Sequence, residues 1–119
     1  MTIDEEGQAR TTEWKIKVAK EIYELAVKEY GMEPGDLLFD MLTFPLSSGQ
    51  EDLRQDAIAT LNAITKVKEI LPGVHTVLGV SNISFGLKPS ARRVLNSVFL
   101  AAAIDAGLDA AIVNACLLY

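Results

Sequence analysis

The sequence predicts an α/β fold built from parallel (β/α) units, and three observations support this prediction. Short apolar segments alternate with longer amphipathic segments along the chain, in the order (β)αβαβαβ. The short segments are apolar at consecutive positions, which is typical of strands in a parallel sheet that is covered on both faces. Pro72-Gly73 and Gly107 separate two of the helices from the strands that follow them, as helix-ending residues do.

The expected elements are bounded by residues that favour their starts and ends. Thr11 or Thr12 can cap the first helix, and Gly31 follows it where a left-handed residue is favoured. Met1-Thr2-Ile3 is expected to be the tail of a further strand. The remaining elements are expected, in order, to be a helix at 12–30, a strand at 37–40, a loop at 41–49, a helix at 50–71, a strand at 74–80, a helix at 89–106 with an inward stripe of Val94, Leu95, Val98, Phe99 and Ala102, and a strand at 110–115.

Composition limits the classes of protein to which the chain can belong. Its 119 residues allow one domain at most, and a hydrophobic fraction of 50% indicates a packed core rather than disorder. No apolar run approaches the roughly 20 residues that a membrane span requires. The opening, MTIDEE, does not resemble a secretion signal. We therefore expect a cytoplasmic protein that makes no contact with membranes.

Charge and the rare reactive residues exclude further classes. The formal net charge is −5, and the basic residues form no stripe, so nucleic acid is not an expected partner. Cys116 is the single cysteine, which excludes an intramolecular disulfide, and His75 is the single histidine. These two residues lack the spacing of a metal site, and no metal ligand is expected in this chain.

Each expected strand ends in a polar side chain or is followed by one. The four residues are Asp4, Asp40, Asn82 and Asn114. Because parallel strands have their carboxyl ends at one edge, these side chains are expected to converge on one site, although strand ends also become polar simply where loops begin. A carboxylate accepts two coplanar N–H donors, and an Asn side chain both donates and accepts. The pattern therefore suggests recognition of a flat heterocycle such as a pterin, rather than a nucleophile.

Four stretches, in order and at characteristic spacing, carry a resemblance to a known family. They are IDEEGQARTTEWK (3–15), DLLFDMLTFPLSSG (36–49), LPGVHTVLGVSNISFGLKPSARRVLNSVFL (71–100) and AGLDAAIVNA (106–115). Together they resemble the pterin-binding (methyltetrahydrofolate-binding) domain of cobalamin-dependent methionine synthases. The GVSN turn followed by LNSVFL is the most specific of these features, and DEEGQA supports it independently.

The resemblance implies a TIM-type (β/α)8 barrel whose carboxyl-end rim binds 5-methyltetrahydrofolate. Such a barrel has about 250 residues, so residues 1–119 would form roughly half of it, about strands four to seven. By this resemblance Asp40 holds the pterin ring, and Asn82 is the catalytic residue that hydrogen-bonds near N5. The other candidate substrate-binding residues are Gly79 and Ser81 along the ring, Arg92 or its neighbour Arg93 at the pterin, Asp4 and Asn114 at the rim, and Phe85, which either stacks on the ring or packs under the turn.

The implied reaction passes the methyl group of the substrate from N5 to cobalamin on another domain or protein, and then to homocysteine. A hydrogen bond from Asn82 that strengthens as the C–N bond breaks would accelerate the transfer. The zinc site that the family uses for homocysteine lies on a further domain.

Alternative interpretations remain open. The chain could be a truncated, non-catalytic half barrel that only binds pterin, or that associates with itself or another chain through its open strand edges. It could also be another pterin-binding enzyme, such as a corrinoid protein methyltransferase or a dihydropteroate synthase relative. The dihydropteroate synthase family prefers a lysine where Asn82 stands, which makes this the weakest resemblance.

Overall fold

A three-stranded parallel sheet in the order β3-β4-β5 forms the central layer of the molecule. This parallel sheet confirms the predicted α/β class with parallel (β/α) units. The computed structural model describes residues 1–46 and 51–118. The sheet and the helices that connect its strands are β3 (Leu38–Asp40), α2 (Glu51–Ile70), β4 (His75–Gly79), α3 (Pro89–Asp105) and β5 (Ala110–Ile112).

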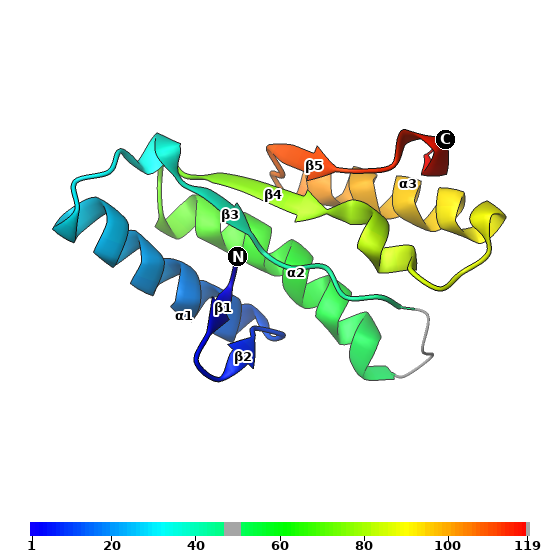
Figure 1. Cartoon of the computed structure of the whole chain (residues 1–119), viewed down its shortest axis with the longest axis horizontal. Coiled ribbons are helices and arrows are strands. Elements are labelled where there is room, and N and C mark those ends of the chain that lie inside the picture. The colour runs from blue at the N-terminus through cyan, green and yellow to red at the C-terminus, as the bar shows by residue number, and fades with distance from the viewer. Residues whose placement is uncertain (47–50, 119) are drawn as a thin grey trace.

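Among the described residues, five elements precede the sheet along the chain, and a 3-10 helix follows each of the strands β4 and β5 (Figure 1). The first long helix changes from α to π geometry before Gly31, so the expected helix at 12–30 is present as two adjoining segments. These elements are β1 (Ile3–Asp4), β2 (Gly7–Gln8), α1 (Thr12–Tyr23), the π-helix η1 (Glu24–Glu29), and the 3-10 helices η2 (Pro34–Asp36), η3 (Val80–Ser84) and η4 (Ala115–Leu117).

The core lies between the sheet and the helices. Phe39 and Leu78 extend from β3 and β4 into a buried cluster with Ala19 of α1, Ile64 of α2 and Phe99 of α3. In Figure 1 the strands pass in front of α2 and α3, which cover the far face of the sheet. Burial of these apolar side chains supplies the main favourable free energy of folding.

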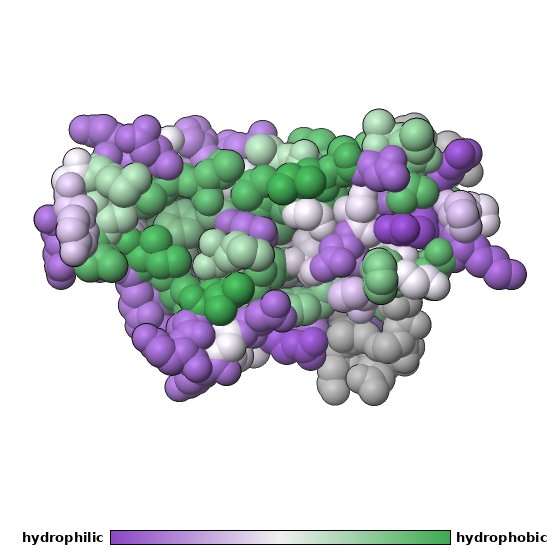
Figure 2. Space-filling view, viewed as in Figure 1, coloured by the Kyte–Doolittle hydropathy of each residue, from purple (hydrophilic) through white to green (hydrophobic). Residues whose placement is uncertain are grey.

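The other face of the sheet is open, and it carries apolar side chains beside His75 and Asp40. Successive strand residues point to opposite faces, so Leu38, Val77 and Ile112 share the face that the helices do not cover. Leu38 is 53% exposed and Ile112 is 68% exposed. Figure 2 shows apolar residues gathered on this side of the molecule. The strands therefore have the two apolar faces that the sequence predicted, with one face uncovered.

The amino terminus differs from its predicted form. Residues 1–3 were expected to end a parallel strand, but β1 pairs with β2 in an antiparallel hairpin. The turn is favoured because Asp4 Oδ1 accepts a hydrogen bond from the Glu6 amide at 3.0 Å and Gly7 adopts a φ of 130°. Thr2 nevertheless donates its amide to the Asp40 carbonyl at 3.0 Å, so the first residues lie beside the end of β3.

The orientation of α3 was predicted only in part. Of the expected inward stripe, Phe99 is buried and Leu95 packs against the core, but Val94 and Val98 are 52% and 62% exposed, and Ala103 is buried instead. The reason is Asn96, which is fully buried and accepts a hydrogen bond from Ser84 Oγ at 2.6 Å. Satisfying this buried amide fixes the rotation of the helix, and the two valines then face outward.

Most other element bounds agree with the sequence. The helices expected at 50–71 and 89–106 and the strand expected at 74–80 are present within one or two residues, and the last strand ends earlier than the expected residue 115. Residues 47–49 of the expected loop lie outside the described residues. Within the described ranges, no helix combines the length and apolarity needed to cross a membrane.

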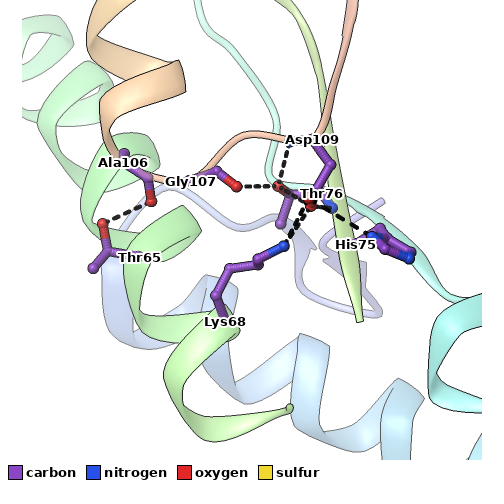
Figure 3. A network of polar contacts seen from close by, with 7 residues as sticks. All are labelled: Thr65, Lys68, His75, Thr76, Ala106, Gly107 and Asp109. Carbon is purple, nitrogen blue, oxygen red and sulfur yellow. Dashed lines mark hydrogen bonds and ion pairs between the residues drawn. The ribbon is translucent and has the colours of Figure 1, made fainter. Parts of the chain in front are cut away.

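A polar network joins β4, α2 and the start of β5 at the amino end of the sheet (Figure 3). Asp109 accepts hydrogen bonds from Lys68 Nζ at 2.7 and 2.8 Å and from the Thr76 amide at 2.8 Å. His75 Nδ1 lies 3.7 Å from the same carboxylate. Burial raises the pKa of Asp109, but the hydrogen bonds from Lys68 and Thr76 outweigh this effect and hold the pKa below its usual value.

Replacing Asp109 by Asn is expected to lower the free energy of unfolding by about 1–2 kcal/mol, since the charge-assisted bonds to Lys68 are lost. Because the pKa of Asp109 is lower in the folded chain than in the unfolded chain, its carboxylate stabilises the fold above the ordinary pKa of an aspartic acid, and this stabilisation is lost as the pH falls through the lowered pKa. Urea denaturation of the wild-type chain and of Asp109→Asn, near neutral pH and near pH 3, measures the difference in their free energy of unfolding. This difference is expected to be smaller at pH 3. Asp36→Asn, at an exposed position, is the control. An equal loss in both variants would contradict this assignment.

Candidate functional site

The loop after β3 turns sharply and fixes the carboxylate of Asp40. Asp40 Oδ1 accepts a hydrogen bond from the Leu42 amide at 2.9 Å. Leu42 has a φ of 61°, a left-handed conformation that is costly for a residue with a side chain. Thr60 of α2 donates its hydroxyl to the Leu42 carbonyl at 2.8 Å and supports this conformation. No described residue donates a hydrogen bond to the second carboxylate oxygen of Asp40, so this oxygen is available to a ligand.

Asn82 connects this loop to the end of β4. The strand ends at Gly79 and continues as η3, in which Val80 and Ile83 are buried. Burial of these two side chains leaves Asn82 on the exposed side, where its Nδ2 donates to the Thr43 carbonyl at 2.5 Å. The second N–H and the carbonyl oxygen of the amide remain for other partners.

A cavity of about 390 Å³ opens at the carboxyl end of the sheet. This volume lies within the range of small-molecule sites, about 300–1,000 Å³. A Cβ added at Gly79 would meet no atom within 4 Å, so the missing side chain leaves this part of the cavity open. The structure thus brings Asp40, Gly79 and Asn82 to one cavity. Its lining residues are Met1, Gln8, Asp40, Leu42, Thr43, Phe44, Pro45, Gly79 and Asn82.

Lys15 lies behind the cavity and is fully buried. Its Nζ donates to the Met41 carbonyl at 2.6 Å and to the Ala9 carbonyl at 2.8 Å, and lies 5.2 Å from the centre of the Phe44 ring. Burial lowers the pKa of Lys15 to about 8, although Asp56 and Asp40 favour the charged form. A buried cation is rare and requires such partners.

The sequence interpretation did not single out Lys15. It lies on the same helical stripe as Val18, Ala19 and Ile22, because residues three, four and seven positions apart share one face of a helix. A lysine on the inward stripe of an amphipathic helix is the sequence feature that could have identified it.

Two of the four strand-end residues do not reach the cavity. Asp4 belongs to the β1–β2 hairpin, and its Oδ2 accepts a hydrogen bond from Trp14 Nε1 at 2.7 Å. This bond, opposed by burial, lowers the pKa of Asp4. Asn114 turns toward η4 and accepts from the Cys116 amide at 3.0 Å. The predicted convergence of all four side chains is therefore wrong for Asp4 and Asn114, because local turns engage both side chains.

Three further candidate residues lie outside the cavity lining. Ser81 Oγ accepts from the Asn114 amide at 3.1 Å. Arg92 donates through Nε to Ser84 Oγ and through Nη2 to the Ser81 carbonyl, both at 3.0 Å. Phe85 is 63% exposed. Arg92 thus bonds the η3 segment that carries Asn82 and does not itself line the cavity.

The chemistry available at this cavity is recognition rather than nucleophilic attack. Asp40 offers an acceptor and Asn82 offers both a donor and an acceptor, which suits a planar ring with N–H and C=O groups along one edge. Among the described residues, no group of three or more His, Cys, Asp and Glu side chains could hold a metal ion. Cys116 is exposed at η4 and does not line the cavity.

Comparison with known proteins agrees with this chemistry. A family model described as pterin binding enzyme matches residues 1–114. A methionine synthase of Mycobacterium leprae is 52% identical over 115 residues, and one of Mycobacterium tuberculosis is 50% identical over the same length. Each alignment covers 97% of this chain but only 10% of the relative, so the chain spans about a tenth of the length of these methionine synthases.

Replacing Arg92 by Met is expected to lower the free energy of unfolding by about 1–2 kcal/mol, because a charged donor is lost from Ser84 and from the Ser81 carbonyl. Arg93→Met is the matched control, since Arg93 is exposed and, among the described residues, its side chain bonds only the Cys116 carbonyl, at 3.2 Å. Its effect is expected to stay within about 0.5 kcal/mol. Urea denaturation measures both. Equal effects would show that Arg92 does not support η3.

Proposed function

The chain belongs to the pterin binding enzyme family, and from this premise we propose that its cavity binds 5-methyltetrahydrofolate as part of a cobalamin-dependent methionine synthase. The observation that carries the proposal is the meeting of Asp40 and Asn82 at one cavity of about 390 Å³, at the carboxyl end of parallel strands. In this proposal residues 1–119 supply about strands four to seven of the barrel.

Asp40 is proposed to orient the pterin ring. Its Oδ1 is held by the Leu42 amide at 2.9 Å, which fixes the plane of the carboxylate. The second oxygen can then accept N–H groups from the edge of the pterin, and a fixed acceptor loses little entropy when the ligand binds. Gly79 gives the flat ring room, because no side chain rises from the sheet at this position.

Asn82 is proposed to act near N5 of the substrate. One N–H of its amide is held by the Thr43 carbonyl, which directs the remaining donor and the carbonyl oxygen into the cavity. The amine left after methyl transfer is a poor leaving group unless N5 gains a proton or a strong hydrogen bond. A donor that binds N5 more tightly in the transition state lowers the barrier. Cobalamin, held outside this chain, would supply the acceptor for the methyl group.

The full reaction of the proposed enzyme requires parts that lie beyond these residues. Transfer onward to homocysteine would use a zinc site on another domain. Because the chain matches only 10% of the length of its relatives, methyltransferase activity is proposed for the whole enzyme and pterin binding for this part.

A second candidate function is pterin binding without turnover by a half barrel that associates with another chain. The open apolar face at Leu38 and Ile112 favours it, because a sheet with an uncovered face and free edges readily pairs with further strands. Sedimentation of the purified chain distinguishes a monomer from such an assembly.

Isothermal titration of the chain with 5-methyltetrahydrofolate tests the proposed function. Binding is expected, and Asp40→Asn and Asn82→Ala are each expected to weaken it by about tenfold or more, since one good hydrogen bond contributes about 1.4 kcal/mol. Asn62→Ala, on the exposed face of α2, is the matched control and should leave the affinity unchanged. Circular dichroism verifies that each variant is folded. Absence of binding by the folded wild-type chain, or full affinity in both site variants, would refute the proposal.

A further inference from the structure

Side chains from three different elements bind three successive carbonyl groups of the loop after β3. Lys15 of α1 holds the Met41 carbonyl, Thr60 of α2 holds the Leu42 carbonyl, and Asn82 of η3 holds the Thr43 carbonyl. The donor–acceptor distances are 2.6, 2.8 and 2.5 Å, respectively. Met41, Leu42 and Thr43 are themselves buried, so these carbonyls have little access to water and depend on side-chain donors.

Lys15 differs from the other two donors because it joins two walls of the cavity. Its second hydrogen bond reaches the Ala9 carbonyl, next to Gln8, which lines the cavity from the hairpin side. Its ammonium group also lies near the ring of Phe44, another lining residue, and Arg10 lies 4.8 Å from the same ring. One buried cation therefore contacts the loop at two points and the hairpin segment at a third.

The loop requires this support because its conformation is strained. Leu42 has a φ of 61°, and a residue in this strained conformation persists only where its surroundings hold it. Without the bond from Lys15 to Met41, the peptide that precedes Leu42 is free to rotate. The Leu42 amide would then leave Asp40 Oδ1, and the carboxylate would lose its fixed plane.

We propose that Lys15 is a positioning residue for the ligand cavity: its buried ammonium group holds Leu42 in the left-handed conformation and thereby keeps the Asp40 carboxylate directed into the cavity. This inference rests on the proposed function, since the cavity is taken to be the pterin site. Lys15 itself does not line the cavity and acts through the loop.

The charge of Lys15 provides a readout that a purely structural residue would lack. The charged groups facing it are Asp56 of α2 and Asp40 of β3, which favour the ammonium form, and Arg10, which opposes it. Burial brings its pKa to about 8, so raising the pH through this value removes the charge and weakens its bonds to the two carbonyls. The Leu42 amide nitrogen is bonded directly to the Met41 carbonyl carbon and therefore reports on this change.

Amide hydrogen exchange and titration of the full chain test the proposal. In Lys15→Met, exchange at the Leu42 amide is expected to accelerate at least tenfold, and affinity for 5-methyltetrahydrofolate to fall at least tenfold. Lys20→Met, an exposed lysine on the same helix, is expected to change both by less than twofold. Unchanged exchange and affinity in a folded Lys15→Met protein would overturn the proposal.

A measurement on the wild-type chain covers the case in which Lys15→Met does not fold. The NMR resonance of the Leu42 amide is expected to shift with a midpoint near pH 8, the pKa of Lys15, and Lys20→Met should retain this titration. A resonance that does not move while Lys15 loses its proton would overturn the positioning role. Failure of the wild-type chain to bind the folate would instead refute the proposed function, while the exchange and the titration still decide the role of Lys15.

Discussion

Buried backbone carbonyls after β3 need hydrogen-bond donors, and the arrangement of the cavity depends on how this requirement is met. Side chains of α1, α2 and η3 supply these donors to the loop. These bonds join the packing of the helices to the geometry of the strand ends. Asp40 and Asn82 consequently occupy fixed positions, and the surface between them is a cavity rather than a mobile loop. Packing on one side of the sheet thus determines the shape of the cavity at its edge.

The order and type of the elements were predictable because they depend on local patterns. Hydrophobic periodicity predicts the helices and strands, and helix-ending residues such as Pro72-Gly73 and Gly107 mark their limits. The predicted bounds lie within a few residues of the observed ones. The orientation of α3 was not predictable from periodicity, because this helix carries apolar residues on more than one face. A buried amide, Asn96, selects the face that packs, and its partner Ser84 lies in a segment that only the tertiary fold brings near.

The candidate site was predictable in part. The rule that parallel strands end at one edge correctly brings Asp40 and Asn82 together. It fails for Asp4 and Asn114, because short polar side chains that begin a turn often bond the nearby backbone, and no sequence pattern separated these residues from the first two. Lys15 and the left-handed Leu42 were not foreseen, since a charged residue is normally assigned to the surface and a leucine to regular backbone.

The uncovered face of the sheet affects how readily isolated chains associate with one another in solution. Ile112 and Leu38 present apolar surface at both outer strands, where another molecule can extend the sheet by main-chain pairing. The net charge of −5 opposes such contacts by mutual repulsion. Added salt screens this repulsion but leaves the apolar attraction intact. Higher ionic strength is therefore expected to favour association of the isolated chain.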